Sequence, residues 1–117
     1  MNSDMTIRAL AALAQEHRLA IFRLLVKQGP AGMPAGEIGE RIGISPTSAS
    51  FHLKELDRAG LIRARRDGRF IRYAFSTETM RELLAFLTED CCQGRPELCG
   101  DLFSQMKCRS KKELVDE

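Results

Sequence analysis

The sequence lacks any apolar run approaching the roughly 18 residues that are needed to span a bilayer. Its first residues, MNSDMTIRAL, lack the basic segment followed by an apolar segment that marks an export signal. Repeats and low-complexity segments are also absent. We therefore expect a cytoplasmic protein without a membrane partner, in a compartment where cysteine thiols stay reduced and act as ligands or reactive groups more often than as disulfides.

Net charge is small as well, because the 117 residues carry a formal charge of only +2. The distribution of charge is more informative than the total. Residues 41–75 contain eight basic and three acidic side chains, a surplus of +5, which leaves −3 for the rest of the chain. A basic block on a near-neutral protein is typical of a surface that faces phosphate groups, although a solvated charged face has the same composition.

Apolar periodicity predicts a mainly α-helical domain. We expect helices over residues 5–15 and about 17–28, then a loop at GPAGMPAG. A short helix follows, with Ala35, Ile38 and Ile42 on one face. The helix at 17–28 carries apolar residues on two adjacent faces and should be buried broadly.

A fourth helix is predicted between Ser45-Pro46, which suit the capping and first helical positions, and Ala59-Gly60, which end it. Ala49, Leu53 and Leu56 fall on its inward face. Small hydroxyls in the first turns, with a lysine beyond, suit a helix that lies against phosphates and base edges. The outward residues are Thr47, Ser48, Ser50, Phe51 and Lys54.

The segment LIRARRDGRFIRYAF predicts a β-hairpin, because Asp-Gly joins two alternating runs. A two-residue Asp67-Gly68 loop would pair Arg66 with Arg69, and Arg63 with Arg72. The same register would pair Ala64 with Ile71 and Ile62 with Tyr73. One face is then apolar (Ile62, Ala64, Ile71, Tyr73, Phe75), whereas the other carries Arg63, Arg65, Phe70 and Arg72. Like charges directly opposite each other destabilise a ribbon, and an external anion would relieve that conflict.

The last clear helix is predicted from about Ser76, and Gly94-Arg95-Pro96 breaks it. Its apolar stripe lies beyond a domain that already has a core, so we interpret the stripe as a subunit interface. We divide the chain into a main domain, 1–92, and a C-terminal segment with a charged tail, 93–117. The stripe consists of Met80, Leu83, Leu84, Leu87 and Cys91.

Two helices, a short helix-turn-helix and a basic hairpin stand in the order of a winged helix. The chain resembles the ArsR/SmtB family of bacterial metalloregulators over roughly residues 5–92. The resemblance implies a homodimeric repressor that dimerises through its first and last helices, binds operator DNA and releases it when metal binds. It rests on ALAQEHRLAIFRLL, on Ser48-x-Ser50-x-His52-Leu53-x-x-Leu56-x-x-Ala59-Gly60-Leu61, and on Arg66-x-Gly68-Arg69 followed by Tyr73.

The same resemblance implies which residues touch DNA. The outward residues of the fourth helix, from Thr47 to Lys54, would face the major groove. The residues expected to approach phosphates or the minor groove are His52, Arg65, Arg69 and Arg72.

Members of this family carry their metal sites at different positions in the fold. Two of these positions, on the third helix and on the last helix, lack the usual ligands in this chain. The third helix, GEIGERIG, has no cysteine, and the last helix has neither of the two histidines. Cys91, Cys92 and Cys99 instead resemble the arsenic-sensing branch, in which a vicinal cysteine pair at the end of the last helix is followed by a third cysteine. The resemblance implies arsenic(III), or antimony(III), as the inducer.

The chemistry of these thiols agrees with that interpretation. Trivalent arsenic is soft and takes three thiolates in a pyramid, and soft ions select cysteine. Neighbouring helical residues point about 100° apart, so Cys91 and Cys92 converge only if the helix ends there. Gly94 and Pro96 supply that break, and the chain from Cys92 to Cys99 is long enough to return.

Alternative roles for the cysteines stay open. A lone cysteine at position 91 would be a core residue. Cys108 could complete a set of four ligands for structural zinc, and without such a site it would be a spectator. Cys99 could form a redox disulfide with Cys91 or Cys92. Cadmium, zinc or oxidation are therefore rival inducers, and a metal trafficking or storage module is the alternative of another class. We do not expect an enzyme, because Arg95 follows the cysteines at three and four positions, whereas the oxyanion loops of cysteine phosphatases need Cys-x5-Arg.

Overall fold

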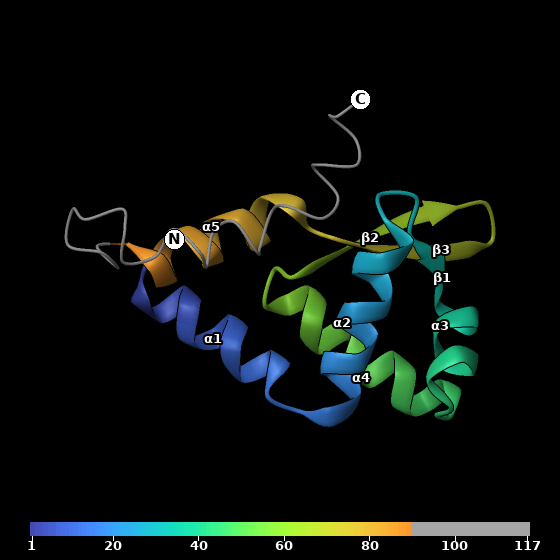
Figure 1. Ribbon diagram of the computed structural model, residues 1–117. Coiled ribbons are helices and arrows are strands. Elements are labelled where there is room, and N and C mark those ends of the chain that lie inside the picture. The colour runs from blue at the N-terminus through green and yellow to red at the C-terminus, as the bar shows by residue number, and fades with distance from the viewer. Residues whose placement is uncertain (90–117) are drawn as a thin grey trace. The chain divides into compact units, whose positions relative to one another are not determined.

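The computed structural model describes residues 1–89, which form a mainly α-helical domain with a small antiparallel sheet, as predicted (Figure 1). By contacts the chain separates into two compact units, Met1–Phe86 and Leu87–Glu117. The predicted domain boundary after residue 92, and all four cysteines, lie outside the described residues. The elements are α1 (Ser3–Leu13), α2 (Glu16–Gln28), β1 (Met33–Pro34), α3 (Ala35–Ile42), α4 (Pro46–Arg58), β2 (Ile62–Asp67), β3 (Phe70–Phe75) and α5 (Thr77–Thr88).

Polar side chains fix where the first two helices begin. The Asn2 side chain accepts a hydrogen bond from the Met5 N–H at 2.9 Å, and the Gln15 side chain accepts one from the Arg18 N–H at 2.9 Å. Such bonds satisfy backbone donors that have no partner within a helix. The cap at Asn2 starts α1 two residues before the predicted position, and the helix ends at Leu13 because Ala14 leaves helical geometry.

The core lies between the helices and the sheet. On α2 the buried side chains form a single stripe, Ile21, Phe22 and Leu25, whereas Leu19 and Val26 are 46% and 37% exposed. The prediction that this helix is buried on two faces is therefore wrong for one of them. The largest fully buried side chains are Ile21, Leu25, Met33, Ile38, Leu53, Leu56, Leu61 and Ile62.

A short strand, β1, lies inside the segment predicted as a loop. Met33 pairs with Tyr73 and Pro34 with Arg72, which gives the strand order β1-β3-β2. Gly32 makes this approach possible, because its φ is +73° and a Cβ there would stand 2.5 Å from the Tyr73 carbonyl oxygen. Two residues that include a proline show no alternation, so the sequence pattern does not reveal the strand.

The hairpin forms with a register that differs from the predicted one. Asp67 pairs with Phe70, Arg65 with Arg72 and Ile62 with Phe75, so the turn residues are Gly68 and Arg69 rather than Asp67 and Gly68. Gly68 has φ +67°, as the first central position of both common hairpin turns requires. The register shifts by two residues, and because side chains alternate with period two, every side chain keeps its predicted face.

Candidate nucleic-acid interface

α4 begins at the capping and proline residues predicted for its start. The Ser45 hydroxyl accepts a hydrogen bond from the Ser48 N–H at 3.1 Å, and Pro46 takes the first helical position. Ala49, Leu53 and Leu56 are buried against the domain, as predicted. This anchoring sets the opposite face of the helix toward solvent.

The exposed face of α4 brings four of the predicted DNA-contacting residues together. Thr47, Ser50, Phe51 and Lys54 line an open hollow of about 480 Å³ that begins at Pro46. Phe51 is 56% exposed. Ser48, the fifth predicted residue, is half-buried and does not line the hollow. Hydroxyls, an apolar ring and a lysine supply hydrogen bonds, a contact for thymine methyl groups and a phosphate ligand.

His52 does not lie on this exposed face, contrary to the prediction that it approaches phosphates. It is 9% exposed; its ring lies 5.6 Å from that of His17 and 5.3 Å from that of Phe51. Its Nδ1 is buried without a hydrogen-bond partner in the described part of the chain. Burial, followed by the nearby Arg18 and His17 charges, lowers the pKa of His52 from its ordinary 6.5, while Glu55 opposes the shift.

The lowered pKa predicts that the domain loses stability in mild acid. Below pH 6.5 His52 takes up a proton in the unfolded chain but stays neutral in the folded domain. The free energy of unfolding should therefore decrease as the pH is lowered, until the pH reaches the pKa of His52 in the folded domain. Urea unfolding between pH 8 and pH 5 measures this slope. The His52→Gln variant should show a weaker slope than the wild type. Equal slopes in wild type and His52→Gln would contradict the assignment.

The β2–β3 hairpin, here called the wing, carries a group of exposed arginines. Arg65, Arg66 and Arg69 are exposed, and none of them has an ion-pair partner among residues 1–89. Arg63 differs, because its guanidinium lies 3.4 Å from the Glu78 carboxylate. Sequence reasoning did not assign Arg66 to DNA contact, although its exposure matches that of Arg65 and Arg69.

Arg72 lies on its predicted face of the wing, but unlike Arg65 and Arg69 it has partners within the domain. Its guanidinium donates to the carbonyl oxygens of Ala31 at 3.1 Å and Gly32 at 3.4 Å, and it lies 3.5 Å from the Asp67 carboxylate. The side chain thereby connects the wing to the loop before β1.

The two kinds of arginine should respond differently to replacement. Arg65→Ala or Arg69→Ala should weaken binding to all DNA sequences and flatten the dependence of affinity on salt, by about one unit of log–log slope for each phosphate that is no longer neutralised. Arg72→Ala should lower the melting temperature, which the other two variants leave unchanged. Salt titrations by fluorescence anisotropy, beside thermal melts, measure both effects. An unchanged slope in Arg65→Ala and Arg69→Ala would remove the wing from the interface.

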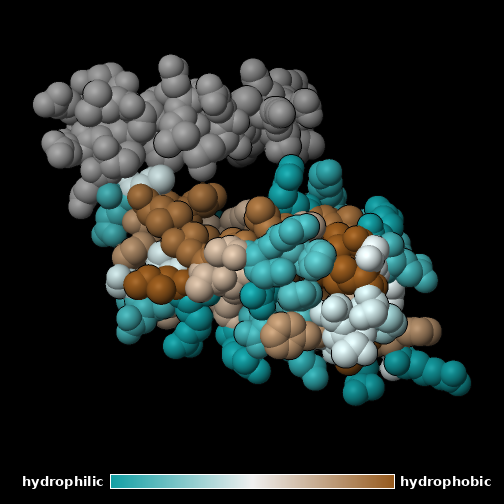
Figure 2. All heavy atoms as spheres, turned by 90° about the horizontal axis from the view of Figure 1, so that it is seen from below, coloured by the Kyte–Doolittle hydropathy of each residue, from teal (hydrophilic) through white to brown (hydrophobic). Residues whose placement is uncertain are grey.

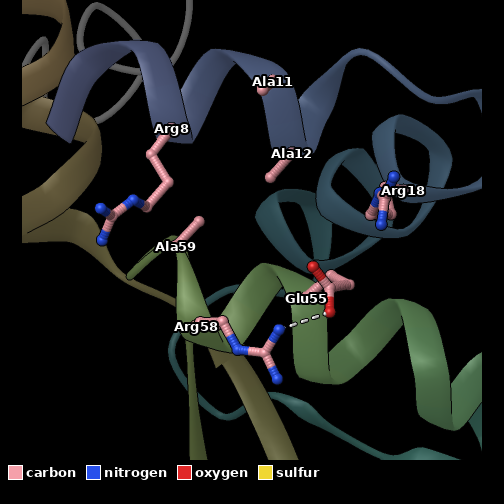
Figure 3. Close-up of a pocket in the computed structure, with 7 residues that line it drawn as sticks. All are labelled: Arg8, Ala11, Ala12, Arg18, Glu55, Arg58 and Ala59. Carbon is pink, nitrogen blue, oxygen red and sulfur yellow. Dashed lines mark hydrogen bonds and ion pairs between the residues drawn. The ribbon is translucent and has the colours of Figure 1, made fainter. Parts of the chain in front are cut away.

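A second group of arginines surrounds a pocket of about 270 Å³ between α1, α2 and α4. Figure 3 shows Arg8 extending from α1 toward Ala59, at the end of α4, and Arg58 meeting Glu55. The Arg58–Glu55 ion pair measures 2.8 Å, and the Nε of Arg18 is buried without an acceptor among the described residues. These arginines are far apart in the sequence, so no local pattern indicates the pocket.

Exposed apolar side chains gather on α1 and α5. Apolar surface lies at the left of Figure 2, on the side where Figure 1 draws these two helices. On the predicted stripe, Leu83 is buried and Met80 packs against the core, whereas Leu84 and Leu87 are exposed. The exposed residues are Met5 (47%), Ile7 (61%), Leu10 (41%), Leu84 (39%) and Leu87 (51%).

Neither a metal site nor a membrane span is found in the part of the chain that the structure describes. Within residues 1–89, no three His, Cys, Asp or Glu side chains are grouped so that they could hold a metal ion. In the same residues, no helix combines the length and the apolar character needed to cross a membrane.

Comparison with known proteins identifies the family. A helix-turn-helix domain model matches residues 13–65. The regulator YceK of Bacillus subtilis, described as an uncharacterized HTH-type transcriptional regulator, is 46% identical over 69 residues, which cover 57% of this chain and 68% of YceK.

Two solved structures agree with this. HlyU from Vibrio cholerae is 35% identical with a TM-score of 0.60, over 74% of this chain and 94% of HlyU. Mb0332 from Mycobacterium bovis, described as a homodimeric winged helix-turn-helix DNA-binding domain and a possible ArsR-family regulator, is 34% identical with a TM-score of 0.61, over 73% and 76% of the chains. The chain belongs to the ArsR/SmtB family of winged helix-turn-helix transcriptional regulators.

Proposed function

We propose that this chain is a cytoplasmic, homodimeric repressor that binds operator DNA and is released by arsenic(III) or antimony(III). The observation that carries the DNA-binding part is the exposed face of α4, which presents Thr47, Ser50, Phe51 and Lys54 together. Arg65, Arg66 and Arg69 of the wing add positive charge without partners among residues 1–89. In this proposal α4 reads base edges in the major groove, while the wing neutralises phosphates.

Dimerisation through α1 and α5 is the second part of the proposal. The exposed Met5, Ile7 and Leu10 of α1, with Leu84 of α5, form the kind of apolar surface that a monomer rarely leaves in water. The relative Mb0332 is described as homodimeric. Two copies of α4 related by a two-fold axis would then read two half-sites of an operator.

The inducer is the third part, and the donor set of the cysteines supports it. Three thiolates are a fitting set for a soft trivalent ion that binds three ligands. Cys91 stands three positions after Thr88, the last residue of α5, so the ligands follow directly on the helix that carries Leu84 and Leu87. Release requires that the ion bind the free dimer more tightly than the DNA-bound dimer.

Repression, rather than activation, is also part of the proposal. HlyU, 29% identical over 79% of this chain, is described as a transcriptional activator. A structure of HlyU, 34% identical, is described as that of its reduced form, and this favours oxidation as a second candidate signal. Cadmium and zinc are the other rival inducers.

A parallel titration tests the proposal. Operator-bound protein is titrated with arsenite, antimonite, zinc, cadmium and peroxide, and release is followed by fluorescence anisotropy. Release by arsenite and antimonite at the lowest concentrations would support the metalloid assignment, whereas earlier release by peroxide would replace it with a redox sensor. Failure to shift promoter DNA at any salt concentration would favour a metal trafficking or storage module.

A further inference from the structure

Phe70 stands out at the tip of the wing. It is 65% exposed, more than any other large apolar side chain among residues 1–89. It is the first residue of β3, directly after the Gly68-Arg69 turn, and its cross-strand partner is Asp67. None of the ring–ring contacts found in the described residues involves it.

The surroundings of Phe70 are charged rather than apolar, and the arginines among them outnumber the one carboxylate, that of Asp67 opposite the ring. By alternation it lies on the same face of the wing as the Arg65–Arg72 pair, the next pair on that face along the ribbon. Arg69 precedes it in the turn and is exposed. A protein partner that covered this ring would have to bring acidic groups, whereas DNA supplies negative charge and apolar base surface together.

We propose that Phe70 enters the minor groove of operator DNA and wedges against a base step beneath the wing. This inference rests on the proposed DNA-binding function. Proteins that deform the minor groove combine basic side chains with an apolar wedge, and a narrow minor groove attracts arginine. The minor groove is only about 6 Å wide, so a hairpin reaches it with the side chains of its tip, where Phe70 and Arg69 lie.

The arrangement of elements allows the wing and α4 to contact one duplex. Figure 1 shows the wing's turn on the same side of the domain as α3 and the first turn of α4. With α4 in the major groove, the wing reaches toward the neighbouring minor groove. The operator would then be selected partly at a position that α4 does not touch, where a flexible pyrimidine–purine step is easier to unstack than a stiff one.

The experiment uses a duplex selected from a random pool by the full-length wild-type protein, with the wing's position found by footprinting. Affinity is measured for this duplex with a TA step and with a stiff AA step beneath the wing. The duplex bend is measured by fluorescence transfer between its ends. Phe70→Ala removes the wedge, Phe70→Leu keeps an apolar one, and Ile71→Ala truncates the next residue, on the opposite face of the wing, as the matched control.

Wild type should prefer the TA duplex and bend it. Phe70→Ala should lose about tenfold in affinity for the TA duplex, the TA preference and most of the bend. Its salt slope should stay that of wild type, because phenylalanine neutralises no phosphate. Phe70→Leu should keep part of each effect, and Ile71→Ala should keep all of them.

Two results would overturn the inference while leaving the proposed function intact. One is a Phe70→Ala variant with wild-type TA preference and bend. The other is an equal loss of affinity on both duplexes, which would show that the ring packs only against the backbone. A wild-type protein that selects no duplex from the pool would instead refute DNA binding itself.

Discussion

Replacing Cys91, Cys92 or Cys99 by serine is expected to give a repressor that binds its operator normally and is no longer released by arsenite. Each replacement removes one of three soft ligands, and a serine hydroxyl is a poor substitute for a thiolate toward trivalent arsenic. The surfaces of α4 and the wing stay unchanged, since these cysteines follow α5 in the sequence. Operator release by arsenite, measured for each variant beside apo-protein affinity, separates loss of sensing from loss of folding.

Cys108→Ser is the matched control, because it removes a thiol that the proposed site does not use. It should respond to arsenite as wild type does. Methylarsenite needs only two thiolates, so Cys99→Ser, which keeps the vicinal pair, should still respond to it. A Cys108→Ser variant that ignores arsenite, beside a fully responsive Cys99→Ser, would mean that other residues build the site.

The fold was predictable wherever local chemistry decides it. Ser45-Pro46 starts α4 through a hydroxyl cap and a fixed proline φ, and Ala59-Gly60 follow its last residue, Arg58. The inward Ala49, Leu53 and Leu56 follow from helical spacing alone, and all three are buried. The face opposite them, which holds most of the candidate interface, was therefore identified correctly from the sequence.

Features that depend on long-range contact were not predictable. β1 forms because Gly32 lets Met33 pair with Tyr73, forty residues further along the sequence, and nothing near Met33 indicates this pairing. The hairpin turn was misplaced by one residue because Asp-Gly and Gly-Arg both fit a two-residue loop. Either register leaves the same residues on each face of the hairpin, so the hydrophobic pattern could not choose between them.

His52 and Arg72 show the same limit within the candidate site. Both lie in segments with a basic or DNA-facing pattern, yet His52 is turned toward His17 of α2 and Arg72 toward the Ala31 and Gly32 carbonyls. A residue's chemistry shows what it can bind. Which partner it meets depends on elements that are distant in sequence.

The packing of α1 against α4 is a physical route by which binding of the proposed inducer would affect the candidate DNA-binding surface. α1 packs against α4, and Arg8 of α1 lines the same pocket as Arg58 and Ala59 at the end of α4 (Figure 3). In the proposed dimer, α1 and α5 form the interface. A change in how these helices pair would therefore act on α4, the helix proposed to read DNA, with α1 as the connecting element.

Placing a charge in the α1–α5 surface is expected to dissociate the protein and abolish operator binding. Leu10→Glu on α1 or Leu84→Glu on α5 would force a carboxylate into an apolar interface, at a cost of several kcal/mol that separation of the subunits avoids. A monomer holds only one half-site, so operator affinity should fall by at least about a hundredfold, while the folded domain keeps its helical content. Sedimentation velocity and gel shifts measure the two effects.

Leu19→Glu is the matched control for this test. Leu19 is 46% exposed, close to the 41% of Leu10 and the 39% of Leu84, but it lies on α2, outside the proposed interface. The same substitution there should leave a dimer that binds DNA, because a charge at a site already in water buries nothing new. If Leu10→Glu and Leu84→Glu both sediment as dimers while Leu19→Glu dissociates, the subunits meet through α2, and the inducer would have to act on DNA binding by another path.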